Sequence, residues 1–272
     1  MTTSEFEEDV NDGEDRDERG RGSADRRYTS WGVVAAGGGG GRIASEFFVD
    51  DPTPGVDDRV VLMNTHPADI RLTIEQLSER APDIEERFRE HAFVFGSRDG
   101  AGNKFQHGRE CVAEDADEVV RRLSSEVAAA NALLYVCTLG GGTGNGTVPY
   151  LIRLLKGELD EGAYSGWMDG LNHVALAVWP YASESDHRQY NAVCGLSRLM
   201  LTPDRAQNAD MVLLASNEHL GEASGDDVDR GVVNRKLSEA VSLMIAAGRR
   251  TDEVIDVEEI GRASCRERVY CE

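Results

Sequence analysis

Lysine is scarce in this 272-residue chain, and acidic residues outnumber basic ones by 50 to 29, which gives a formal net charge of -21. Lys104, Lys156 and Lys236 are the only lysines, and arginine supplies the other basic groups. Nucleic-acid binding needs a basic footprint, so this balance argues against that class of function. The acidic residues continue through the body of the chain, and an acidic surface stays hydrated in molar salt. We therefore expect a salt-adapted cytoplasmic protein.

Long apolar runs and metal-binding patterns are also missing. No stretch approaches the roughly 20 apolar residues of a membrane span, and the N-terminus lacks the apolar core of a signal peptide. We therefore predict no direct membrane insertion. The five cysteines have no metal-ligand spacing and the histidines are scattered, so neither a zinc site nor a catalytic histidine has support. Cys137 and Cys194 are expected to lie in the core.

The N-terminal segment contains almost no large apolar side chains. It is rich in Asp, Glu, Arg and Gly, and such a segment cannot bury enough surface to fold. We expect residues 1–30 to form a disordered acidic tail.

The most informative segment that is present is the glycine-rich run LGGGTGNGT at residues 139–147. It stands between an apolar, strand-like stretch and an amphipathic helix. Glycines let backbone N–H groups close on an anion, and the helix N-terminus adds the positive end of its dipole. This context favours a phosphate-binding loop over a flexible linker. A Walker A loop is excluded, because Thr147, Val148 and Pro149 follow Gly146 where Lys and Ser or Thr are required.

Apolar segments typical of strands recur along the chain, with helical segments between them. They lie at residues 32–36, 60–63, 133–138, 174–179 and 211–215. Strands that alternate with helices predict an α/β fold with a mostly parallel, Rossmann-like sheet and helices on both faces. Ligands bind such sheets at the carboxyl ends of the strands. The glycine-rich and polar segments that draw attention all follow a predicted strand, apart from residues 100–103.

Several segments resemble, in the right order, the nucleotide loops of the tubulin/FtsZ superfamily of GTP-binding cytoskeletal proteins. The run GGGTGNG resembles the family's signature loop. The glycines that follow the first strand resemble its N-terminal phosphate loop. Arg42 comes directly after them, where FtsZ usually has Asn; a basic residue at this position resembles the haloarchaeal CetZ branch. Asn64-Thr65 with Asp69 resembles the end of the second strand, although His66 departs from the family pattern. Gly100-Ala101-Gly102-Asn103 is similar to the loop that faces the terminal phosphate.

The resemblance continues through the second half of the chain. Glu184 lies where relatives place an acid against the ribose, and Arg188 where FtsZ places an arginine at the base. Tyr190-Asn191-Ala192 looks like a tubulin helix start. Asn217, which ends a strand, and Asn234, which opens a helix at 232–247, match guanine-contacting positions. The implied nucleotide contacts are Gly38, Gly39, Gly40, Gly41, Arg42, Gly100, Ala101, Gly102, Asn103, Gly140, Gly141, Gly142, Thr143, Gly144, Asn145, Gly146, Pro180, Glu184, Arg188, Asn191, Asn217 and Asn234.

The resemblance also implies GTP hydrolysis that is completed between adjacent subunits of a head-to-tail filament. In the family, acidic residues after the central helix of one subunit polarise the water that attacks GTP on the next. Asp256 and Glu259 stand at the two acidic positions, and a solvated acidic helix end is the alternative for this short match. The implied ligands are GTP or GDP with Mg²⁺ on the phosphates, and no protein metal ligand is expected. The implied partner is the same chain or a related tubulin-like protein, in cell division or cell-shape control.

The domain organisation follows from the same comparison of motifs. We expect residues 31–258 to form the GTP-binding domain with its central helix. Tubulin and FtsZ relatives continue into a second domain, which is expected to be missing here. Residues 259–272 read like the translation of a sequencing adapter and are expected to be a non-native tail.

Two alternatives stay open at this point. The first is a paralogue that binds nucleotide without hydrolysis and acts as a scaffold or polymer regulator. The two hypotheses differ in the role of Asp256 and Glu259, which would take part in hydrolysis only in a GTPase. The second is an NAD-dependent oxidoreductase, because Gly39, Gly41 and Ala44 fit the G-x-G-x-x-A fingerprint. That site also needs an acidic residue at the end of the second strand, where this chain has Asn64-Thr65.

Overall fold

A computed structural model describes residues 29–247 of the chain, apart from residues 50–55, 57–58, 80, 83–84, 128, 160–169 and 223–229. The expected acidic tail at 1–30 lies almost wholly outside the described residues. The expected non-native tail at 259–272 lies entirely outside them.

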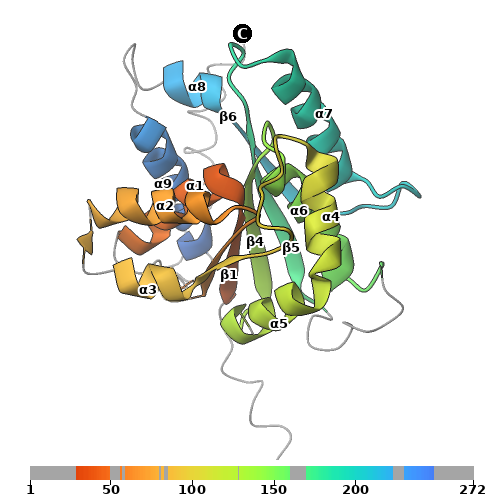
Figure 1. The fold of residues 1–272 in the computed structure, drawn as a ribbon, viewed down its shortest axis with the longest axis horizontal. Helices are drawn as coiled ribbons and strands as arrows, with labels where there is room; N and C mark the ends of the chain where they lie inside the picture. Colours follow the sequence, from red (N-terminus) through yellow and green to blue (C-terminus); the bar gives the residue numbers. More distant parts are fainter. Residues whose placement is uncertain are drawn as a thin grey trace, which may run out of the picture.

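A six-stranded parallel sheet forms the centre of the molecule, in the order β3-β2-β1-β4-β5-β6 (Figure 1). The strands are β1 (Trp31–Ala36), β2 (Val60–Asn64), β3 (Ala92–Val94), β4 (Ala132–Thr138), β5 (Asn172–Trp179) and β6 (Met211–Ser216). The five predicted strands are present within one or two residues, and the predicted fold class is confirmed. β3 was not predicted.

Helices cover both faces of the sheet (Figure 1). They are α1 (Gly37–Val49), α2 (Pro67–Ser78), α3 (Glu85–Glu90), α4 (Phe105–Glu114), α5 (Ala116–Val127), α6 (Thr143–Leu155), α7 (Asp186–Met200), α8 (Asn217–Glu222) and α9 (Arg230–Ala247). One apolar cluster joins the sheet to α4, α5, α6 and α7, and a second joins it to α1, α2, α3 and α9. The inner strands β1, β2, β4 and β5 read as apolar runs because both of their faces are buried, whereas the edge strands β3 and β6 are partly exposed.

The strand order explains where a ligand can bind. From β1 the chain enters α1 on one face of the sheet, whereas from β4 it enters α6 on the opposite face. β1 and β4 are neighbours, so the loops at their carboxyl ends diverge and leave a crevice between them. Crevices at such a reversal of strand order are where parallel α/β sheets bind ligands.

Several local predictions need correction. Tyr190-Asn191-Ala192 lies in the second turn of α7 rather than at its start, because the helix already begins at Asp186. Asn217 begins α8 instead of ending β6, and Asn234 lies in the second turn of α9. Cys137 is fully buried in β4 as expected, but Cys194 is only partly buried, because it lies on α7 beside the exposed Val193. Within the described part of the chain, every helix is too short or too polar to cross a membrane.

Candidate functional site

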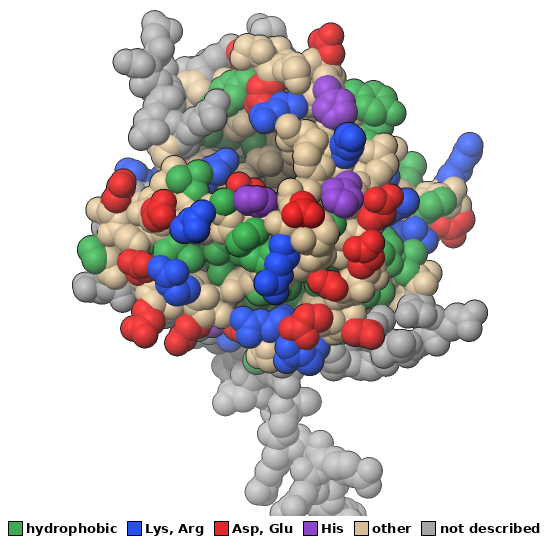
Figure 2. Space-filling model, in the orientation of Figure 1, with side chains coloured by type: hydrophobic (Ala, Val, Ile, Leu, Met, Phe, Trp, Pro, Cys, Tyr) green, Lys and Arg blue, Asp and Glu red, His purple; other side chains and the backbone are tan. Residues whose placement is uncertain are grey.

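A cavity of about 550 Å³ opens at the carboxyl ends of the strands. Figure 2 shows the molecule hollowed in the upper half of this face, with charged and histidine side chains around the rim. The volume lies within the range of small-molecule sites in proteins. The lining residues are Gly37, Gly38, Gly39, Arg42, His66, Asp69, Gly100, Ala101, Gly102, Asn103, Thr138, Gly140, Gly141, Gly142, Thr143, Gly144, Val178, Pro180, Tyr181, Glu184, Arg188, Asn217, Val233 and Asn234.

Most of the residues that the sequence resemblance implicated therefore surround one cavity. Five of them do not line it: Gly40, Gly41, Asn145, Gly146 and Asn191. The lining also includes Gly37, His66, Asp69, Thr138, Val178, Tyr181 and Val233, which were not predicted as contacts. Two further predicted residues, Asp256 and Glu259, lie outside the described part of the chain.

The glycines after β1 allow α1 to start directly at the sheet edge. Gly37 has a φ of +79°, in the left-handed region that favours glycine. A Cβ on Gly39 would lie 2.6 Å from Thr138 Oγ1, and one on Gly40 would lie 3.1 Å from the Val136 carbonyl carbon. The first turn of α1 thus packs against the backbone of β4. Its unpaired N–H groups lie at the cavity, where they can bind an anion.

The signature loop brings a second helix N-terminus to the same cavity. α6 begins at Thr143, and no side chain caps it at Gly142. A Cβ on Gly144 would lie 2.5 Å from Ala36 O, so α6 also starts in backbone contact with the sheet. The Thr143 hydroxyl is 2.7 Å from that of the fully buried Thr65, which ties the loop after β2 to the signature loop. Two converging helix N-termini and their glycine loops form a cradle suited to phosphate groups.

The sequence of the third loop, residues 100–103, suits the left-handed backbone conformations that three of its residues adopt. Gly100, Gly102 and Asn103 have φ values of +80°, +54° and +58°. Glycine and asparagine adopt this region more readily than other residues. Gly100 N donates to Thr65 O at 3.1 Å, which anchors the loop beside the end of β2. The loop follows β3, the strand that was not predicted, so it too obeys the rule that ligand loops follow strands.

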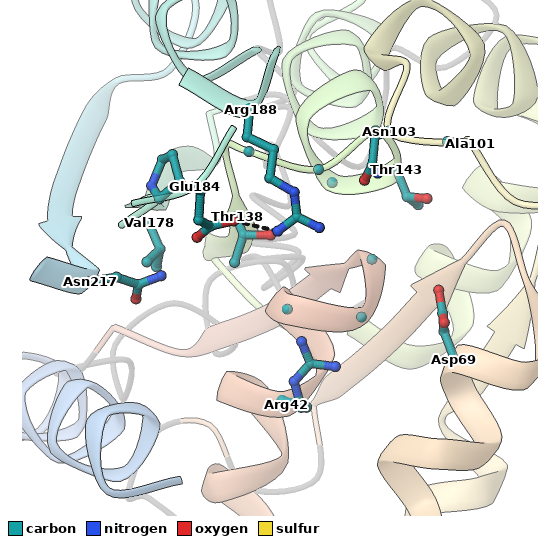
Figure 3. A pocket seen from close by; sticks show the side chains of 18 of the residues that line it. Arg42, Asp69, Ala101, Asn103, Thr138, Thr143, Val178, Glu184, Arg188 and Asn217 are labelled. Carbon is teal, nitrogen blue, oxygen red and sulfur yellow. Dashed lines mark hydrogen bonds and ion pairs between the residues drawn. The ribbon is translucent and has the colours of Figure 1, made fainter. Parts of the chain in front are cut away.

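Figure 3 shows two differently equipped ends of the cavity. Glu184, Arg188, Val178 and Asn217 lie at one end, and Asp69, Asn103 and Thr143 lie at the other, with the glycine loops between them. Arg188 donates to the Glu184 carboxylate in an ion pair, and Tyr181 N donates to Glu184 Oε1 at 3.1 Å. Figure 3 also shows the guanidinium groups of Arg42 and Arg188 directed into the cavity.

His66 has a structural role that the sequence did not indicate. Its Nδ1 accepts a hydrogen bond from Ala68 N at 3.1 Å, so the side chain caps α2. The ring lies beside Gly100, since a Cβ built there would be 3.6 Å from His66 Cδ2. His66 therefore joins the start of α2 to the 100–103 loop.

Comparison with known proteins agrees with this geometry. Residues 31–225 match the model of the Tubulin/FtsZ family, GTPase domain, and the chain belongs to this family. The predicted superfamily is confirmed, and nothing in the match supports the oxidoreductase alternative.

The relatives that the chain resembles include a CetZ protein and FtsZ proteins. The tubulin-like protein CetZ2 of Haloferax volcanii is 28% identical over 238 residues, which cover 84% of this chain and 58% of CetZ2. The cell division protein FtsZ of Methanothermobacter thermautotrophicus is 32% identical over 125 residues, which cover 46% of this chain and 27% of FtsZ.

Two solved structures share the fold. CetZ2 from Haloferax volcanii in a GTPγS-bound protofilament aligns with a TM-score of 0.63 at 25% identity, over 86% of this chain and 62% of that one. CetZ1 from the same organism, a GDP-bound monomer, aligns with a TM-score of 0.63 at 22% identity, over 85% and 62%. The chain thus spans less than two thirds of the length of these relatives.

Proposed function

We propose that the chain binds GTP and GDP in the cavity at the carboxyl ends of the strands, with the phosphates on the glycine loops. The observation that carries this proposal is the convergence of the N-termini of α1 and α6 and the left-handed 100–103 loop on one cavity. The backbone N–H groups of these segments suit the oxygens of a polyphosphate. Arg42, directed into the cavity (Figure 3), adds a positive charge.

The opposite end of the cavity has the groups that a guanine nucleoside needs. Asn217 and Asn234 carry amides that can donate and accept at once, which suits the mixed donor and acceptor edge of guanine. The Glu184 carboxylate can accept from ribose hydroxyls, and Arg188 holds that carboxylate in place. In this arrangement Asn217 and Asn234 contribute the preference for guanine, while the glycine loops bind the phosphates of any nucleotide.

We further propose that the protein hydrolyses GTP and assembles head to tail with itself or a related tubulin-like protein. The CetZ2 structure that this chain resembles is a GTPγS-bound protofilament. Asp256 and Glu259 of one subunit would polarise the attacking water on the next, and Mg²⁺ would neutralise charge on the phosphates. The acidic, lysine-poor composition supports a salt-adapted cytoplasmic protein, and CetZ and FtsZ relatives support a role in cell shape or cell division.

Equilibrium competition tests the nucleotide proposal directly. A fluorescent GTP analogue is bound to the purified chain in molar KCl and then displaced by unlabelled GTP, ATP or NAD. Displacement by GTP at concentrations well below those needed for ATP and NAD is the expected result. Equal displacement by NAD, or no binding by a folded sample, would overturn the proposal. If GTP binds, absence of concentration-dependent hydrolysis would favour the non-hydrolysing paralogue.

A further inference from the structure

Two asparagines that resemble nucleotide contacts are in fact buried beneath the floor of the cavity. Asn145 is 0% exposed and Asn191 is 1% exposed, and neither lines the cavity. A buried amide must find partners inside the protein, because an unsatisfied one costs about 1–3 kcal/mol. Their partners lie on the phosphate loops and on α7.

Asn145 lies in the first turn of α6, and the partners of its amide come from the signature loop and from α7. Its Nδ2 donates to Leu139 O in the signature loop and, at 2.7 Å, to Asn191 O in α7. Its Oδ1 accepts from Arg198 Nη2, and the same Nη2 lies 3.4 Å from the main-chain oxygen of Asn145. That oxygen has lost its helical partner, because Pro149, four residues on, has no N–H. Arg198 therefore replaces a hydrogen bond that Pro149 removes.

Asn191 joins the two loops that face the phosphate end of the cavity. Its Nδ2 donates to Asn103 O at 2.7 Å and to Gly140 O at 3.2 Å. His187, one turn earlier on α7, is also within 3.0 Å of Asn103 O through its Nε2. Asn103 has a left-handed backbone, which is unfavourable for a residue with a side chain unless its surroundings hold it. α7 supplies that support.

Arg198 extends the same connections to α4. Its guanidinium carbon lies 3.9 Å from the centre of the Phe105 ring, at the first residue of the helix that follows the 100–103 loop. Burial lowers the pKa of Arg198 to about 10, so the side chain is still cationic at neutral pH. A planar guanidinium can stack on a ring and donate from its edge at the same time, which an ammonium cannot.

We propose that Asn145, Asn191 and Arg198 are positioning residues that set the signature loop and the 100–103 loop relative to each other for the phosphates. This inference rests on the proposed binding of GTP. Asn145 and Asn191 hold main-chain oxygens of the two loops without lining the cavity, and Arg198 holds Asn145. The three side chains therefore act through the loop backbone rather than on the nucleotide. Disturbing them should weaken contacts to phosphate and leave the guanine end, with Asn217, unchanged.

The test compares two partial ligands in competition with a fluorescent GTP analogue: inorganic tripolyphosphate, which probes only the phosphate end, and guanosine, which probes only the base end. The variants are Arg198→Lys, Arg198→Gln and Asn191→Ser. Arg121→Gln is the matched control, since Arg121 is an exposed arginine of α5 that pairs only with Glu118 among the described residues. Melting temperatures are measured in parallel, and binding is measured well below them.

For Arg198→Gln and Asn191→Ser we expect tripolyphosphate binding to weaken about 10- to 100-fold, as loss of one or two buried hydrogen bonds implies. Guanosine binding should stay within about two-fold of wild type. The tripolyphosphate affinity of Arg198→Lys, which keeps the charge, should lie between those of wild type and Arg198→Gln. A parallel loss for both ligands, no loss for either, or failure of all three variants to fold would show a purely structural role and overturn the inference. Failure of the wild-type chain to bind GTP would instead overturn the proposed function.

Discussion

Gly146→Ala should destabilise the fold, although Gly146 resembles a nucleotide contact. Gly146 lies in the first turn of α6, where this helix meets α4. A Cβ there would lie 2.6 Å from Arg109 N and 2.8 Å from Gly108 C, whereas ordinary contacts begin at 3.4 Å. The obstructing atoms are backbone, so the two helices would have to move apart.

The size of the effect follows from two opposing contributions. Overpacking of this kind costs about 1–3 kcal/mol, and replacing glycine by alanine inside a helix returns up to about 1 kcal/mol. The steric cost should exceed the gain, because the methyl group meets backbone atoms rather than the end of a flexible side chain. A net loss of about 1–2 kcal/mol would lower the melting temperature by roughly 2–8 °C for a domain of this size.

Gly141→Ala is the matched control in the same loop. The nearest atom to its built Cβ is Thr138 Oγ1 at 3.8 Å, so the methyl group fits without displacement. Gly141 lines the cavity, however, and its substitution should weaken GTP binding. Thermal unfolding without nucleotide and GTP titration on both variants separate the two effects. The steric reasoning is refuted if Gly146→Ala melts within about 1 °C of wild type, or if Gly141→Ala is equally destabilised.

Three further predictions concern other parts of the chain. Burial and the nearby Lys156 lower the pKa of His173 from 6.5 to about 4, so the stability that its neutral form contributes is present above pH 6.5 and is lost as pH falls toward 4. In urea unfolding, His173→Gln should reduce this acid-induced loss of unfolding free energy by up to about 3 kcal/mol. An unchanged pH slope in the variant would contradict this. Asn217→Leu should weaken GTP binding about 10- to 100-fold and leave tripolyphosphate competition unchanged; equal loss for both ligands would argue against a base contact. Asp256→Ala should abolish GTP turnover with GTP binding intact, and normal turnover would rule out its proposed role.

The sheet could be predicted from the sequence because β1, β2, β4 and β5 are buried on both faces and read as apolar runs, and β6, although partly exposed at one edge, is an apolar run as well. The exception is β3, whose residues Ala92–Val94 are all only partly buried at the edge of the sheet. Three residues are too few to show a period. Tertiary pairing with β2, at Leu62, Met63 and Asn64, makes this segment a strand.

The sequence located the segments that form the site, but it did not distinguish residues that line the cavity from residues that pack behind it. Glycine patterns locate backbone that approaches something closely, but they do not show whether that neighbour is a ligand or another helix. Gly38 and Gly141 line the cavity, whereas Gly40 and Gly146 pack against backbone. One signal for the buried network was present: Pro149 stands four residues after Asn145, which predicts a carbonyl in need of a donor. Nothing in the sequence indicated that Arg198 provides it.

The two uses of glycine are linked by the geometry of the helix N-termini. A helix can offer unpaired N–H groups to a phosphate only if its first turn lies against the strand ends. There, side chains would collide with backbone, as Gly40 with Val136 and Gly144 with Ala36 show. The packing glycines therefore contribute to binding without touching the ligand. A variant such as Gly40→Ala should consequently lose stability and phosphate affinity together, whereas Gly141→Ala should lose affinity alone.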